Sequence, residues 1–140
     1  MKPLAQTIYL ASKSPRRREL LRQIGVQFEV LLLRDLPPRG PDVTELVLQN
    51  EDPAAYVARV TLEKVCFAAQ VMALRKLPPR PILAADTTVV IDGQILGKPA
   101  DQAEARAMLS QLSGRSHTVL TSIAVHQSAS NESNANRWQQ

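Results

Sequence analysis

The first 33 residues carry apolar and polar positions in blocks that are typical of a strand, a helix and a second strand. Residues 7–11 form a short, β-prone apolar run, which predicts a buried strand. Ser14 and Pro15 then supply the cap and the first residue of a helix, and Gly25 ends it. The apolar face of this helix is expected to consist of Leu20, Leu21 and Ile24. Residues 28–33 complete a unit of βαβ size.

The middle of the chain predicts a long helix followed by the strongest strand signal. Prolines and a glycine within residues 34–51 exclude a regular element at the start of that stretch, so we expect a loop or an insertion. Asp52 and Pro53 open the helix by the same pattern of cap and proline, and the helix is expected to end before Pro78. Residues 82–91 are almost continuously apolar, which is typical of a buried strand.

A tight hairpin and a capped helix are predicted next along the chain. The pair Asp92-Gly93 favours a two-residue turn, after which the chain returns as a short partner strand over residues 94–96. A capping box then starts a helix that a glycine ends, and its residues are Asp101, Glu104 and Gly114.

The last predicted strand is followed by a change in character. Residues 117–125 are β-rich, whereas residues 126–140 are polar and contain a single large apolar group, Trp138. We therefore predict one domain over residues 1–125 and a disordered tail over residues 126–140.

The amino-acid composition excludes several classes of protein and favours one kind of binding partner. A hydrophobic share of 44% and a charged share of 21% exclude a disordered acidic chain, a collagen-like repeat and a coiled coil. The lone Cys66, expected to be buried on a helix, cannot form an internal disulfide. No apolar stretch is long enough for a membrane span, so a cytoplasmic location without a membrane partner is expected. The net charge of +4 suggests an anionic partner, and the scarcity of aromatic residues favours a small anion over nucleic acid.

The junction between the first strand and the first helix is a candidate anion site. Backbone N–H groups at a helix N-terminus attract anions, and Ser12 and Ser14 add hydroxyl donors. Arg16 lies in the first helical turn and can donate two hydrogen bonds to one phosphate. The alternative is a capped helix with solvated arginines. The absence of a glycine-rich loop excludes a P-loop and a dinucleotide fingerprint.

Asp86 is the most unusual polar residue in the chain, because it interrupts the apolar run of residues 82–91. A carboxylate in a buried strand is costly unless it is paired, hydrogen-bonded or bound to a metal. Asp86 is therefore a candidate general base or metal ligand. The alternative is a structural aspartate held by Thr87 or Thr88.

Two lysines are weaker candidates. Lys64 falls near the middle of the apolar stripe of the long helix, so its side chain either extends to solvent along its stem or meets negative charge. Lys98 lies in a rigid turn between Gly97 and Pro99, a place that also suits an ordinary exposed loop lysine.

Taken together, these residues resemble the motifs of one family, the Maf family of nucleoside triphosphate pyrophosphatases. The resemblance extends from residue 8 to about residue 125, with all five motifs in the family's order and spacing. They are Leu10-Ala11-Ser12-x-Ser14-Pro15-Arg16-Arg17-x-Glu19-Leu20-Leu21, Arg59-Val60-x-x-x-Lys64, Ala84-Ala85-Asp86-Thr87, Gly97-Lys98-Pro99 and Leu112-Ser113-Gly114-Arg115-x-His117.

The resemblance implies a fold, a reaction and a set of site residues. The fold is α/β, with a central twisted mixed sheet flanked by helices in an inosine-triphosphatase-like architecture. The reaction is hydrolysis of dTTP or UTP, and of modified pyrimidine nucleotides as further candidates, to the monophosphate and pyrophosphate with Mg²⁺ or Mn²⁺. Asp86 is implied as the catalytic residue and metal ligand. The implied substrate-binding residues are Ser12, Arg16, Lys64, Thr87 and Lys98. Arg16 and Thr87 are the two residues that favour the dTTP/UTP branch.

Two features depart from the family pattern. Family members carry an acidic residue soon after the second strand, and either Asp35 or Glu45 takes that place here. Family chains also continue beyond the strand that matches residues 117–125, so the chain resembles a truncated member. From this we expect weak, poorly base-selective activity and a protein that aggregates or depends on a homodimer. The alternatives are a catalytically impaired remnant or regulatory fragment and, last, a nucleic-acid-binding module.

Overall fold

A computed structural model of the chain describes residues 6–33 and 45–127, and every strand and helix expected from the sequence is present in it. The elements are β1 (Ile8–Leu10), α1 (Pro15–Gln23), β2 (Phe28–Val30), α2 (Pro53–Leu74), β3 (Ile82–Ile91), β4 (Gln94–Leu96), α3 (Gln102–Leu112) and β5 (Thr118–His126). Most of the expected loop, with Asp35, and the expected tail from residue 128 lie outside the described residues. None of the helices described combines the length and apolarity that a membrane span requires.

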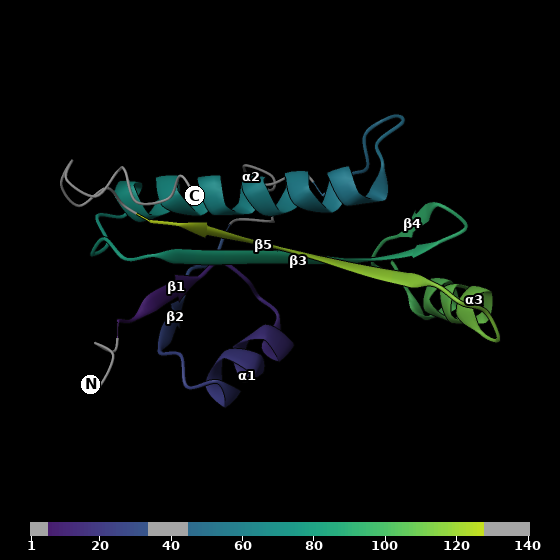
Figure 1. Ribbon diagram of the computed structural model, residues 1–140, viewed down its shortest axis with the longest axis horizontal. Coiled ribbons are helices and arrows are strands. Elements are labelled where there is room, and N and C mark those ends of the chain that lie inside the picture. Colours follow the sequence, from purple (N-terminus) through teal and green to yellow (C-terminus); the bar gives the residue numbers. More distant parts are fainter. Residues whose placement is uncertain (1–5, 34–44, 128–140) are drawn as a thin grey trace, which may run out of the picture.

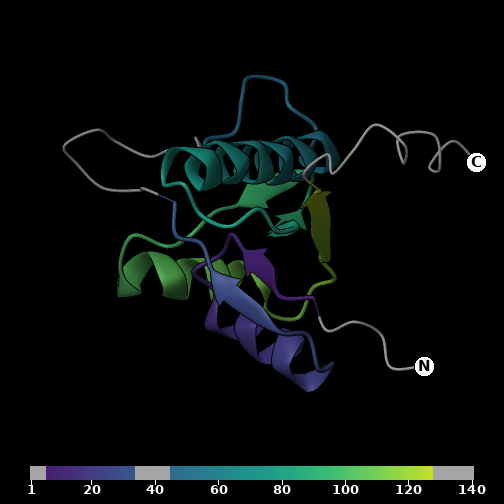
Figure 2. The same ribbon diagram turned by 90° about the vertical axis from the view of Figure 1, so that its left-hand side faces the viewer.

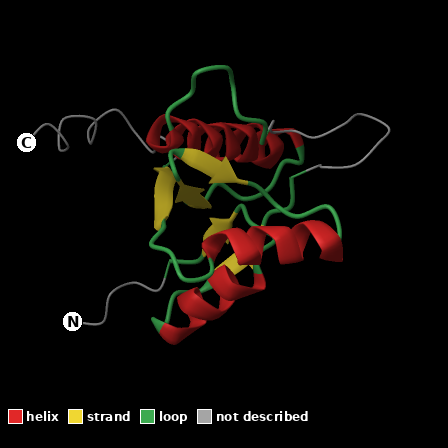
Figure 3. Cartoon of the chain, turned by 90° about the vertical axis from the view of Figure 1, so that its right-hand side faces the viewer, coloured by secondary structure: helices red, strands yellow, loops and turns green. Residues whose placement is uncertain are grey.

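The strands form one mixed five-stranded sheet, as the resemblance implied. The order is β2-β1-β3-β4, and β5 pairs with the other edge of β3. β1 is parallel to β2 and β3, whereas β4 and β5 are antiparallel to β3. Helices α1 and α2 cover opposite faces of the sheet, and α3 lies near β4 at one end of the molecule (Figure 1). The views in Figure 2 and Figure 3 show the same layers, with the strands between the helices.

This strand order places a topological switch point between β1 and β3. The chain leaves β1 through α1 on one face of the sheet and reaches β3 through α2 on the other face. β1 pairs with β3 only at Ile82 and Leu83, and β4 pairs with β3 only from Val89 onward. Within the described residues, no strand pairs with residues 84–88 along this edge of β3. Ligands of open α/β sheets bind beyond the carboxyl ends of parallel strands at such a switch point.

The main core lies between α2 and the sheet. Ile82 and Ala84 of β3 are fully buried against Val65, Ala68 and Met72 of α2. Because successive side chains of a strand point to opposite faces, the even-numbered residues at the start of β3 face α2. Asp86 continues this series, so the same packing directs its carboxylate toward α2.

Local capping and turn chemistry explains where several elements begin. The side chain of Asp101 accepts a hydrogen bond of 2.8 Å from the N–H of Glu104, and Glu104 accepts one of 3.3 Å from the N–H of Ala100. In a standard capping box Glu104 would accept from the N–H of the cap residue Asp101, whereas here it accepts from the N–H of the residue before it. Asp92 and Gly93 have φ angles of 52° and 72°, as a type I′ hairpin turn requires.

The apolar face of α1 is only partly buried, and the expectation that Cys66 is buried was wrong. On α1 only Leu21 is buried, whereas Leu20 is 48% and Ile24 is 72% exposed. The 3.6-residue period correctly placed these side chains near one face of the helix, but among the described residues only part of that face is covered. Cys66 is also exposed, because it follows the buried Val65 by one position and so lies about 100° further around α2.

Candidate active site

Lys64 joins two carboxylates, one from β3 and one from the segment that precedes α2. Its Nζ lies 3.0 Å from Oδ1 of Asp86 and 2.9 Å from Oε1 of Glu45. The side chains of Lys64 and Asp86 are each 15% exposed. Of the two orientations considered for Lys64, the one that meets negative charge is therefore confirmed. Asp86 is held by Lys64, not by Thr87 or Thr88 as the structural alternative required.

Of the two acids considered for the family's second acidic position, Glu45 is the one within the described residues, and it lies beside Lys64. Its Oε2 is 3.7 Å from Nζ of Lys98, whose side chain is 91% exposed. Burial alone would raise the pKa of Glu45, but the hydrogen bond and charge of Lys64 and the charge of Lys98 outweigh it, so the pKa is lowered. Glu45 is therefore ionised at neutral pH. Its ion pairs stabilise the fold there, and this contribution is lost as the pH falls through the lowered pKa.

A second cluster lies on the α1 side of the sheet. Nη1 of Arg17 donates to Oγ of Ser12 at 3.2 Å, and Nη2 donates to Oγ1 of Thr87 at 3.3 Å. Thr87 Oγ1 also lies 3.0 Å from Oγ1 of Thr121, its register partner on β5. The side chain of Ser14 caps α1 by accepting from the N–H of Arg17. Arg17 thus connects Ser12, in the loop after β1, with Thr87 near the middle of β3.

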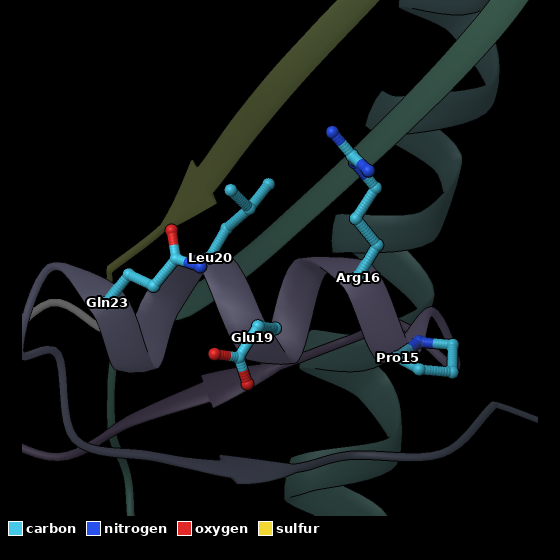
Figure 4. A pocket seen from close by; sticks show the side chains of 5 residues that line it. All are labelled: Pro15, Arg16, Glu19, Leu20 and Gln23. Carbon is cyan, nitrogen blue, oxygen red and sulfur yellow. The ribbon is translucent and has the colours of Figure 1, made fainter.

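Arg16 has a different environment from Arg17. It lies on the exposed side of α1 and lines a hollow together with Pro15, Glu19, Leu20 and Gln23. Figure 4 shows the side chains of Arg16 and Glu19 leaving the helix in different directions. Among the described residues, Ser12 accepts its arginine hydrogen bond from Arg17. The motif contains both arginines, but only the folded chain shows which of them contacts the serine.

The two clusters meet at neighbouring residues of β3. Asp86 faces α2 with Lys64 and Glu45, and Thr87 faces α1 with Arg17. Both residues belong to the stretch of β3 that has no partner strand between β1 and β4 in the described structure. Cations and carboxylates are therefore concentrated at the switch point, where the topology favours a ligand. Sequence reasoning missed Arg17 and Thr121 as members of the site, although Arg17 lay within the first motif.

The carboxylates of Asp86 and Glu45 fit a hard divalent cation. Lys64 contacts one oxygen of each carboxylate, Oδ1 and Oε1. Mg²⁺ is commonly held by one or two carboxylates together with water and substrate phosphates. The described residues contain no group of three or more histidines, cysteines and acids arranged to hold a metal. The donor set thus suits a metal shared with a phosphate ligand better than a closed protein site.

Comparison with known sequences decides the family. The profile described as Maf-like protein matches residues 7–140, nearly the whole chain. The chain belongs to this family. The match confirms the resemblance that the five motifs carried, and it extends past residue 125, where that resemblance ended.

Curated members of the Maf-like family are identical to this chain at about half of the aligned positions. The dTTP/UTP pyrophosphatase of Dechloromonas aromatica (strain RCB) is 48% identical over 119 residues, which are 85% of this chain and 59% of the relative. Proteins of the same name from Burkholderia pseudomallei (strain 1710b) and Ralstonia nicotianae (strain ATCC BAA-1114 / GMI1000) are 53% and 54% identical over 118 residues. Those residues are 84% of this chain and 56% of each relative. The chain thus spans less than two thirds of the length of these relatives.

Proposed function

We propose that this protein is a nucleoside triphosphate pyrophosphatase that hydrolyses dTTP or UTP to the monophosphate and pyrophosphate. The observation that carries the proposal is the pair of carboxylates that contact Lys64 at the switch point, together with the neighbouring pair of Ser12 and Arg17. Membership of the Maf-like family and the shared name of the relatives support the substrate class. A cytoplasmic location and a homodimer stay predictions from the sequence.

The site residues divide into phosphate-binding and water-activating groups. Ser12, Arg17 and Lys98 offer hydroxyl and cationic donors to a triphosphate, and Arg16 extends the positive surface on α1. Thr87 orients Arg17 through its hydroxyl. The charge of these groups compensates for negative charge that builds up on the phosphate oxygens during the reaction.

Asp86 is the proposed general base. Its carboxylate accepts a proton from a water molecule, which attacks the α-phosphorus as the bond from that atom to the bridging oxygen breaks. Pyrophosphate leaves with the electrons of the broken bond. Lys64 holds the carboxylate of Asp86 in place by its contact of 3.0 Å. Asp86 and Glu45 would hold Mg²⁺ or Mn²⁺, which supplies charge neutralisation for the triphosphate when bound.

Product analysis tests the proposed reaction. The purified chain is incubated with dTTP, UTP, dCTP or GTP in the presence of Mg²⁺ or Mn²⁺, and nucleotides, pyrophosphate and orthophosphate are quantified separately. We expect pyrophosphate and monophosphate in equal amounts from dTTP and UTP and no turnover in excess EDTA, while dCTP and GTP measure how weak the base selectivity is. Orthophosphate and the diphosphate as first products would contradict the proposal.

Alanine substitutions at the three consecutive arginines test whether nucleotide binding depends on a specific contact or on net positive charge. Arg17→Ala removes the contacts to Ser12 and Thr87, so we expect KM for dTTP to rise by about 10-fold or more. Arg16→Ala is expected to raise KM less, and Arg18→Ala should leave it unchanged. Steady-state kinetics check the order, with thermal unfolding of each variant as the folding control. Equal effects of all three would indicate that net charge drives binding.

A further inference from the structure

Arg59 attaches the segment that carries Glu45 to the first turns of α2. Its Nε lies 2.8 Å from Oε2 of Glu51, and its Nη2 lies 3.1 Å from Oε1 of the same side chain. Nη2 also donates to the backbone carbonyl of Leu46 at 2.7 Å. Leu46 is the residue next to Glu45, so a single guanidinium contacts both ends of a short stretch of chain. Bidentate pairs of this kind fix geometry as well as supplying energy.

Two further contacts hold the same segment. The hydroxyl of Tyr56, a buried residue of α2, donates to the backbone carbonyl of Glu45 at 3.0 Å. Oε1 of Glu51 accepts from the N–H of Leu48 at 3.1 Å. The guanidinium of Arg59 lies 5.7 Å from the centre of the Tyr56 ring, within the range of a cation–π contact. Arg59 and Tyr56 of α2 therefore form one connected latch on residues 45–51, and Glu51 is the side chain of that segment which Arg59 holds.

The position of Glu45 depends on this latch. Residues 45–48 belong to no helix or strand, so regular backbone hydrogen bonds do not hold them. The side chain of Glu45 reaches Lys64 and Lys98, of which only Lys64 is largely buried. Releasing the latch would free the backbone on both sides of Glu45.

We propose that Arg59 is a positioning residue that holds Glu45 against Lys64 and so completes the carboxylate pair with Asp86. The inference rests on the proposed function for its catalytic consequence, but the placement of Glu45 can be tested without activity. Arg59 contacts Glu51 and the backbone of Leu46, so we expect it to act on the reaction through residues 45–51.

The two glutamates that pair with Arg59 offer a matched comparison. Glu51 belongs to the latched segment, whereas Glu63 lies one turn along α2 and accepts from Nη1 of Arg59 at 3.3 Å. Glu51→Gln and Glu63→Gln both remove one negative charge from the same arginine without changing side-chain size. Only Glu51→Gln, and Arg59→Ala with it, should release residues 45–51.

Hydrogen–deuterium exchange and steady-state kinetics test the proposal together. We expect amide exchange over residues 45–52 to accelerate in Arg59→Ala and Glu51→Gln but not in Glu63→Gln, with similar unfolding temperatures. We expect kcat on dTTP to fall by about 10–100-fold in the first two variants, with nucleotide KM within about 2-fold and a higher Mn²⁺ requirement, because misplaced groups lose rate before they lose affinity. Arg59→Lys should lie between Arg59→Ala and the wild type.

Unchanged exchange over residues 45–52 in Arg59→Ala would overturn the proposal whatever the activity. Faster exchange with kcat and Mn²⁺ dependence equal to those of Glu63→Gln would also overturn it, because the segment would then be irrelevant to the reaction. A wild-type chain without pyrophosphatase activity would contradict the proposed function, and the exchange comparison would still decide whether Arg59 holds the segment.

Discussion

Asp86→Asn is expected to lower kcat on dTTP by about 10²–10⁴-fold, the range that a positioned general base contributes. Asparagine keeps the size of aspartate but cannot accept the proton of the attacking water at neutral pH. The fold should survive, because Lys64 keeps its contact of 2.9 Å with Glu45. The measurement is steady-state kinetics alongside thermal unfolding.

Asp92→Asn is the matched control for this substitution. Asp92 lies in the β3–β4 turn, where it forms an exposed ion pair with Arg115, and its positive φ of 52° is one that asparagine tolerates. Its kcat should stay within about 2-fold of the wild type, since exposed ion pairs contribute little. Full activity in Asp86→Asn would exclude Asp86 as the base.

Lys64→Met is expected to have the largest effect on stability. The change leaves Asp86 and Glu45 without the ammonium that separates them, and two carboxylates then face each other in a partly buried site. Removing one partner of a buried ion pair costs roughly 3–5 kcal/mol, and the partial exposure of Glu45 places our expectation near the lower end, about 3 kcal/mol. Urea unfolding of both proteins measures the difference in the free energy of unfolding.

Lys98→Met provides the same chemical change at an exposed lysine near the same glutamate. Because Lys98 is 91% exposed and 3.7 Å from Glu45, its loss should change the free energy of unfolding by less than about 0.5 kcal/mol. The double variant Lys64→Met/Asp86→Asn should recover part of the stability but none of the activity, since it removes one of the two facing charges. Equal destabilisation by the two lysine substitutions would contradict a structural role for the central ion cluster.

Sequence patterns predicted the elements well because caps and turns act locally. The bounds of β3 and the start of α2 at Pro53 agree with the expectation to the residue. The pattern did not show that Leu20 and Ile24 are exposed. Periodicity indicates which face of a helix is apolar, but not whether another element covers that face.

The site was predictable only where one residue stood out from its neighbours. Asp86 and Lys64 could be identified because each carries a charge within an apolar stretch. In the folded chain Nζ of Lys64 lies 3.0 Å from Oδ1 of Asp86. The contact of Glu45 with Lys64 joins two segments that are distant in sequence. The contact of Arg17 with Ser12 depends on how the first turn of α1 directs the arginine side chain. Such contacts leave no periodic signal in the chain.

Hydrolysis of dTTP in water enriched in ¹⁸O tests the central claim most directly, because it identifies the phosphorus atom that the water attacks. Mass spectrometry of the products separates the two sites of incorporation. The arrangement of Asp86, Lys64 and Glu45 at the switch point predicts one ¹⁸O atom in the monophosphate and none in pyrophosphate. Label in pyrophosphate, with an unlabelled monophosphate, would contradict attack at the α-phosphorus and the role given to Asp86. Label in orthophosphate, with a nucleoside diphosphate as the other product, would contradict the proposed function itself.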